Sequence, residues 1–280
     1  MNALKTTALL ALMSGILLAI GGAAGGQQGL ILMLGVSAVL NFGTWFFADT
    51  VVLRTTGAQP VPPGELDWLR EDVAELAERA GIPAPRLYWT ADPSPNAFAT
   101  GRSPSKGVVA VTAGLLKTLN RREIRGVLAH EIGHIQNRDT LTSAIAATIA
   151  GSITWMAYMV MYSRDRNVHP VLRIAVMLLA PIAATIIRLA ISRTREYAAD
   201  RRAAEISGDP QGLALALQGL SRGVERVPMQ PGSAQNVHMA VNGFTGGLSG
   251  LMSTHPPIEE RVRRLNAMGG RALGSAHRGV

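Results

Sequence analysis

Residues 130–134 read His-Glu-Ile-Gly-His, and this stretch decides how the rest of the chain is interpreted. It lies in a predicted helix from about Arg122 to Arg138. The apolar residues of this helix recur at helical spacing: Ile124, Val127, Leu128, Ile132 and Ile135. Because positions i and i+4 share one face of a helix, the imidazoles of His130 and His134 can reach one ion, and neutral imidazole is a good zinc ligand. The stretch therefore predicts two of the ligands of a metal site.

Glu131 follows the first histidine and lies on an adjacent face of the helix. From there a carboxylate can contact a water on the metal without ligating the metal itself. This is the general-base position of the HExxH metalloproteases. Since a pattern of three fixed positions also arises by chance, a solvated helix face remains the alternative for this motif taken alone.

The third protein ligand is expected in the segment 195–200, Arg-Glu-Tyr-Ala-Ala-Asp. The chain has no cysteine, so a metal must be held by His, Asp or Glu. Glu196 would complete a His2Glu site with a fourth position open for water, the thermolysin-like arrangement. Asp200 lies on the same helix face, where it can accept the free N–H of a metal-bound histidine. The alternative is an exposed charged face with i,i+4 pairs such as Arg201 and Glu205.

The N-terminal region is apolar, and residues 6–48 contain no charged side chain. The Gly-rich stretch 21–29 interrupts this run. Since a membrane span needs about 20 apolar residues, we expect two helices, near 4–22 and 29–49, joined by a tight turn. The alternative is a cleaved signal peptide with Lys5 in its basic region, and the second full-length apolar segment that follows at once disfavours it.

Two further apolar segments follow the HExxH motif. Residues 140–163 contain no charge and predict a third span. The fourth candidate, 171–191, has Arg173 and Arg188 near its ends and Pro181 inside it. It either crosses the membrane or enters it as a re-entrant hairpin.

The order of these segments places the predicted ligands together. Lys5 and Arg54 flank the N-terminal helices, so the positive-inside rule puts both flanks in the cytoplasm. The HExxH motif precedes the third segment and Glu196 follows the fourth. A hairpin of two segments returns the chain to the side it left, so the ligands meet at one membrane face.

The remaining sequence has the pattern of a soluble α+β domain. An amphipathic helix carries an apolar stripe at Leu66, Leu69, Val73, Leu76 and Ala77. Strands are expected at 86–90, 96–100 and 107–112, and a Gly-rich stretch at 227–250 separates two late helices. We predict four parts: 1–50 with two transmembrane helices, 51–139 with the HExxH helix, 140–191 with the third and possible fourth segments, and 192–280 with the third ligand. The predicted fold is mostly helical, a thermolysin-like zincin domain with a small β-sheet fused to transmembrane helices.

Composition excludes several classes of protein. Hydrophobic residues make up 48% of the chain and charged residues 16%, against about 25% charged in a typical soluble domain. The net charge of +8 is dispersed and only 5% of residues are aromatic, which argues against nucleic-acid binding. A membrane protein that faces an anionic leaflet accounts for the basic surplus more simply.

Several motifs, in order, resemble the HtpX heat-shock proteases, which are membrane zinc endopeptidases related to the CAAX prenyl proteases. These motifs are NAFATG at 96–101, HEIGH at 130–134, SRTREYAAD at 192–200 and THPPIEERVRRL at 254–265. The resemblance implies one zinc ion per chain, held by His130, His134 and Glu196, with Glu131 as the base.

The resemblance also implies where a substrate docks. Asn96, Ala97 and Phe98 would lie on a strand edge that an extended polypeptide pairs with. By analogy with the prenyl proteases, His255 would assist catalysis, and Arg261 would contact the substrate. Without the resemblance, His255 before two prolines is simply a residue at a helix entry.

The implied protein is a multi-pass protease of the bacterial inner membrane with a cytoplasmic catalytic domain. The expected substrates are misfolded or damaged membrane proteins, as in a stress response; the expected partners are polypeptides and the bilayer. Two alternatives remain: a prenyl-processing protease, which comes with more spans, and a zinc-stabilised scaffold without activity. A structural zinc site normally has four protein ligands, and the sequence offers three good ones. Substrate identity and oligomeric state are left open.

Overall fold

The structure, a computed structural model, describes residues 2–143, 145, 193–226 and 256–276. These residues form two compact units, one with 2–48, 141–143 and 145, the other with 49–140, 193–226 and 256–276. The bulk of the predicted third segment, the whole of the fourth and the Gly-rich stretch 227–250 lie outside the described residues.

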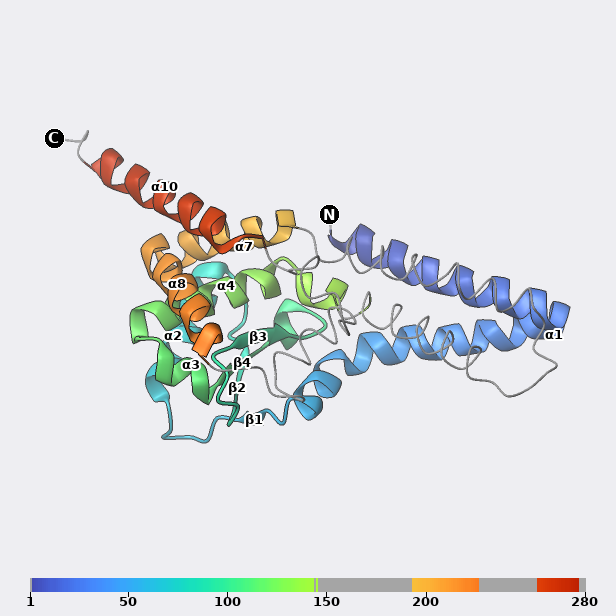
Figure 1. The fold of residues 1–280 in the computed structure, drawn as a ribbon. Coiled ribbons are helices and arrows are strands. Elements are labelled where there is room, and N and C mark those ends of the chain that lie inside the picture. The colour runs from blue at the N-terminus through green and yellow to red at the C-terminus, as the bar shows by residue number, and fades with distance from the viewer. Residues whose placement is uncertain (1, 144, 146–192, 227–255, 277–280) are drawn as a thin grey trace. The chain divides into compact units, whose positions relative to one another are not determined.

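The N-terminal helix α1 (Asn2–Thr55) breaks at Gly25 and Gly26. Gly26 has φ 55° and ψ −136°, a conformation that residues with a side chain rarely adopt. The two halves of the helix lie against each other (blue in Figure 1), and between them the Ser37 hydroxyl donates to Ser14 Oγ at 2.8 Å. The break lies within the turn that the sequence predicts.

One part of α1 is long and apolar enough to cross a membrane. Within the described residues this test selects Gly25–Phe47, with a mean hydropathy of 1.9, whereas Thr6–Ala19 is a shorter apolar helix. Large apolar side chains of the second half are exposed, for example Ile31 at 66% and Val39 at 71%. Lipid is the solvent that suits such a surface. The crossing of the membrane by both halves stays a prediction.

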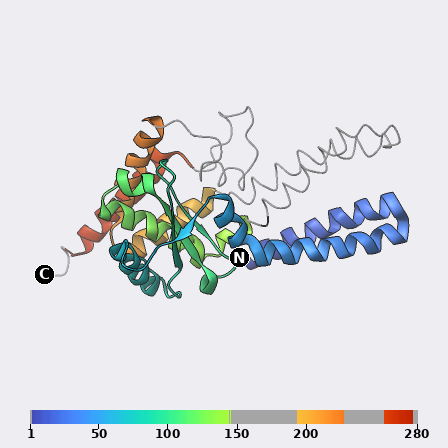
Figure 2. The same cartoon turned by 90° about the horizontal axis from the view of Figure 1, so that it is seen from below.

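The second unit contains a four-stranded sheet in the order β1-β2-β4-β3 (Figures 1 and 2). Its strands are β1 (Gln59–Pro60), β2 (Arg86–Thr90), β3 (Ala97–Thr100) and β4 (Val108–Thr112). β2 and β4 are parallel, whereas β1 and β3 pair antiparallel with their neighbours. The three longer strands confirm the predicted ones to within one residue, and β3 lies at an edge of the sheet.

Helices pack against this sheet and against one another, and they position the site. They are α2 (Asp67–Ala80), α3 (Ala113–Thr118), α4 (Arg121–Gln136), α7 (Arg193–Ser207), α8 (Pro210–Arg226) and α10 (Ile258–Ala276), with a 3-10 turn η1 (Pro104–Lys106). α4 packs against α2, α7, α8 and β3. At Gly126 it approaches α8 so closely that a Cβ would press on the backbone of Leu213.

The two faces of the sheet have different cover. Val109 and Val111 of β4 join the main core with α2, α4 and α8. Phe98 and Val108 point to the other face and pack against Leu53, from the last turns of α1. The predicted stripe of α2 is buried with one difference: Leu66 precedes the helix in a left-handed conformation, φ 52°, instead of lying inside it.

Candidate metal centre

The helix α4 begins with a reciprocal cap that fixes its start. Asn120 Oδ1 accepts from the Glu123 backbone N–H at 3.1 Å, and Glu123 Oε2 accepts from the Asn120 N–H at 3.0 Å. Ile124, Leu128 and Ile132 are at most 2% exposed and face the core. This cap and this buried face fix the rotation of the helix, and so the direction of its two histidines.

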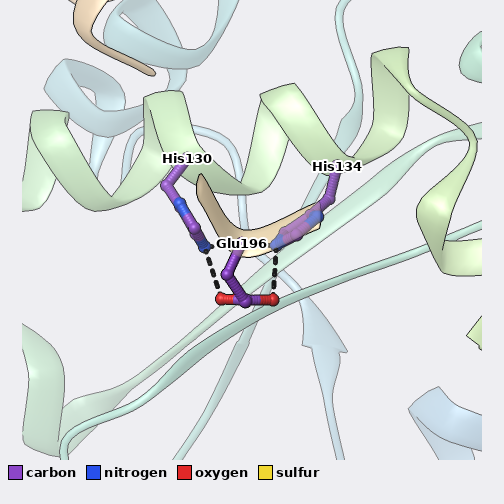
Figure 3. Close-up of side chains that lie close together, drawn as sticks. All are labelled: His130, His134 and Glu196. Atoms are coloured by element: carbon purple, nitrogen blue, oxygen red, sulfur yellow. Dashed lines mark hydrogen bonds and ion pairs between the residues drawn. The ribbon is translucent and has the colours of Figure 1, made fainter. Parts of the chain in front are cut away.

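His130 and His134 converge with Glu196 of α7, as Figure 3 shows. The two imidazole Nε2 atoms lie 3.1 Å apart. Nε2 of His134 is 3.5 Å from Glu196 Oε1, and Nε2 of His130 is 3.6 Å from Glu196 Oε2. The structure thus brings the three predicted ligands together, with one donor atom of each within 4.8 Å of the others.

A buried carboxylate and an arginine stand behind His130. Nδ1 of His130 lies 3.0 Å from Oδ1 of Asp200, although the ring N–H does not point straight at this oxygen. Asp200 in turn accepts from Arg261 of α10, at 2.8 Å from Nε and 2.6 Å from Nη2. Asp200 and Arg261 are only 2% and 4% exposed. Asp200 therefore lies beside a ring nitrogen of His130, and its predicted role as acceptor for a metal-bound histidine stays a prediction.

His134 is supported by a residue that sequence reasoning missed. Its Nδ1 hydrogen-bonds to Oδ2 of Asp139 at 3.0 Å, and Asp139 Oδ1 lies 3.7 Å from Arg195 Nε. Arg138 has φ 59°, a left-handed conformation that turns the chain after α4 and brings Asp139 back to the helix. The sequence signal that could have identified Asp139 is its place as an acidic residue just after the expected end of the helix.

The carboxylates give the site an affinity for positive charge. Burial disfavours a charge on His130, but the neighbouring Asp200 and Glu196 carboxylates outweigh burial and raise the pKa of His130 to about 10. Burial likewise disfavours a charged Asp200, yet Arg261 and His130 outweigh it and lower the pKa of Asp200 to about 2. A proton and a metal cation are both favoured between these groups.

The other predicted residues are placed as follows. Glu131 is half-buried on α4 beside His130. Asn96 is held by its backbone, which donates to Thr112 Oγ1 at 2.9 Å and accepts from the Thr112 N–H at 3.0 Å. Ala97 is half-buried, whereas the Phe98 side chain is 1% exposed and belongs to the core. The predicted catalytic residue His255 lies outside the described residues.

Comparison with known proteins agrees with this geometry. The sequence model of Peptidase family M48 matches residues 63–269. The chain is 46% identical to the "Protease HtpX homolog" of Salinibacter ruber, over 97% of this chain and 100% of the relative. It is 45% identical to the protein of the same name from Methylibium petroleiphilum, over 95% and 98%.

Among solved structures, the crystal structure of S. mikatae Ste24p is similar, with a TM-score of 0.52 and 21% identity. The similarity covers 94% of this chain and 65% of that one, so the chain spans just under two thirds of the length of Ste24p. At this level of identity the likeness shows a shared fold.

Proposed function

The chain belongs to peptidase family M48 and, within it, to the HtpX proteases, and we propose that it is a zinc endopeptidase of the bacterial inner membrane that acts at the cytoplasmic face. It is a metalloprotease by family. The observation that carries the finer proposal is the triangle of His130, His134 and Glu196.

The dimensions of this cluster are close to those of a zinc site. Donors around a tetrahedral zinc ion, each bound at about 2.1 Å, lie about 3.4 Å from one another. The two Nε2 atoms lie 3.1 Å apart, and each lies 3.5 or 3.6 Å from a different oxygen of Glu196, with one donor atom of each residue within 4.8 Å of the others. Three protein donors leave a fourth position for water or substrate, which is the pattern of a catalytic site and not of a structural one. Zinc held there would polarise the scissile carbonyl and make a bound water more acidic.

Glu131 would carry the proton. A carboxylate oxygen of Glu131, next to the first ligand, takes a proton from the attacking water and passes it to the leaving amine nitrogen. We assign His255, by the family resemblance, to help polarise the carbonyl oxygen.

An extended substrate would bind along the free edge of β3. Among the described residues, no strand pairs with the outer side of β3, and β3 packs beside α4, which carries both histidines. Because Phe98 is buried, this edge would bind mainly through backbone hydrogen bonds, which accept many sequences. Asn96 and Ala97 begin this edge. Such tolerance suits misfolded or damaged membrane proteins as substrates.

The experiment that tests the proposal is casein hydrolysis by detergent-purified protein, prepared in chelator and then given zinc. The test variant is Glu131→Gln, and its control is Glu71→Gln, which makes the same exchange at an exposed position of α2. We expect wild type and Glu71→Gln to cleave only with zinc. Glu131→Gln should bind one zinc ion per chain and lose at least about 100-fold in rate, the contribution of a general base.

The opposite result would favour the scaffold alternative. If wild type and Glu131→Gln both bind zinc, and neither cleaves casein or itself, the site is structural and the protease mechanism is wrong for this chain.

A further inference from the structure

The C-terminal helix α10 contacts α7 through two arginines that lie one helical turn apart. Arg261 forms two hydrogen bonds with Asp200, and the Arg264 guanidinium stacks 3.7 Å above the ring of Tyr197. Both arginines are three residues apart on α10, and so are their partners on α7. Only the first of these two contacts involves a side chain that lies against a metal ligand, since Asp200 Oδ1 is 3.0 Å from His130 Nδ1, whereas Tyr197 is joined to Glu196 only through the backbone of α7.

The surroundings of Arg261 differ from those of an arginine that only joins two helices. Its guanidinium is almost completely buried, and its third nitrogen, Nη1, lies 3.7 Å from Glu196 Oε2. Burial disfavours the charge, but Asp200, Glu196 and Glu131 outweigh it and raise the pKa of Arg261 further. A permanent cation therefore lies among the carboxylates of the site.

We propose that Arg261 is a positioning residue of the metal centre: it fixes both oxygens of Asp200, holds Oδ1 beside Nδ1 of His130, and so directs Nε2 of His130 toward the metal ion. This role differs from a substrate contact, because two of the three guanidinium nitrogens are already bound to Asp200. The inference rests on the proposed metal site, but metal affinity tests it without any catalysis.

The shape of arginine explains why this residue type is needed. A guanidinium is a planar fork that fixes a carboxylate through two parallel bonds, whereas a lysine ammonium provides one movable point charge. Without the fork, Asp200 can rotate away from His130. Residues that orient metal ligands from outside typically change metal affinity by about 10- to 100-fold when they are replaced. Since Arg261 acts through Asp200, we expect the lower end of this range.

The test compares two arginines on the same helix. Arg261→Met, Arg261→Lys and the control Arg264→Met are made in full-length protein that also carries Glu131→Gln, which prevents self-cleavage. α10 keeps other anchors in each variant, since Val262 and Leu265 are buried in the main core. The measurements are the zinc dissociation constant by competition with a chromophoric chelator, the visible spectrum of the cobalt(II) form, and the melting temperature of the metal-free protein.

We expect Arg261→Met to weaken zinc binding about tenfold and to change the cobalt spectrum, with Arg261→Lys between it and the parent. Arg264→Met should lower the melting temperature but leave zinc affinity within about twofold. If both methionine variants weaken zinc equally, or if Arg261→Met shifts only the melting temperature, Arg261 is merely structural and the proposal fails. Should Arg261→Met not fold, a folded lysine variant with parental affinity and spectrum overturns the proposal just as well. A parent that takes up no zinc would overturn the metal site itself.

Discussion

His130 and His134 lie one turn apart on α4, yet their ring nitrogens are supported from different distances in the sequence. The partner of His134 is Asp139, five residues later, just beyond the end of the same helix. The partner of His130 is Asp200 on α7, which Arg261 on α10 holds with two short hydrogen bonds. The cation behind Asp139 is farther away, with Arg195 at 3.7 Å.

This difference shows which parts of the fold each ligand depends on. The support of His134 needs little more than the end of α4 and its left-handed turn. The support of His130 needs α4, α7 and α10 packed together. The metal centre therefore joins residues from both halves of the chain, and a change at the distant carboxylate should affect metal binding and folding at once.

The largest predicted effect is the contrast between Asp200→Asn and Asp139→Asn. Asp200→Asn leaves Arg261 buried without its anion, and breaking a buried pair in this way costs about 3–5 kcal/mol. We therefore expect Asp200→Asn to lower the melting temperature clearly and to weaken zinc binding about 100-fold. Asp139→Asn should weaken zinc about tenfold and lower the metal-free melting temperature less than Asp200→Asn, because Arg195 Nε lies 3.7 Å from Asp139. Chelator competition and thermal unfolding of the Glu131→Gln protein measure both. Equal losses in the two variants would remove the distinction between the two supports.

The second prediction, with a smaller expected effect, concerns an exposed ion pair that has the same two hydrogen bonds as Asp200 and Arg261. Asp209 accepts two hydrogen bonds from Arg122, at 2.5 and 2.8 Å, but both side chains are partly or largely exposed. Asp209→Asn keeps a side-chain oxygen for the start of α8 and loses the ion pair, which solvent already screens. We expect zinc affinity to be unchanged and the melting temperature to fall by no more than a few degrees.

The effect of Asp209→Asn should also depend on pH in a defined direction. The hydrogen bonds from Arg122 lower the pKa of Asp209 below its ordinary value. A lowered pKa stabilises the fold above the ordinary carboxyl pKa of about 3.9, and this stabilisation is lost as the pH falls through the lowered value. Wild type and variant should therefore differ in melting temperature at neutral pH and converge on acidification. A difference that grows at low pH would contradict the assignment.

Much of the site could be predicted because its residues repeat at helical spacing. The i,i+4 histidines, and Glu196 with Asp200 four residues later, define two helix faces that the structure places opposite each other. The strands could be predicted from short apolar runs between turn residues. These are local patterns, and local patterns are what a single sequence displays.

The parts that the sequence did not predict depend on tertiary contacts or on unusual backbone. Nothing in the segment 254–265 indicates that Arg261 meets Asp200, because this contact forms only when α10 packs on α7. Asp139 reaches His134 only because Arg138 adopts φ 59°, which is uncommon for a residue other than glycine. Leu66 lies outside α2 for a similar reason, its φ of 52°.

The smallest predicted effect concerns the backbone that brings Asp139 to His134. A side chain in the left-handed region costs about 1–2 kcal/mol, and glycine avoids most of this cost. Arg138→Gly and Arg138→Ala both remove the same exposed arginine side chain, so the difference between them isolates the backbone. We expect the glycine variant to be more stable than the alanine variant by about 1 kcal/mol, which corresponds to a few degrees in melting temperature. Its zinc affinity should equal that of the parent. If alanine is as stable as glycine, the turn after α4 is not strained, and the support of His134 needs no special backbone.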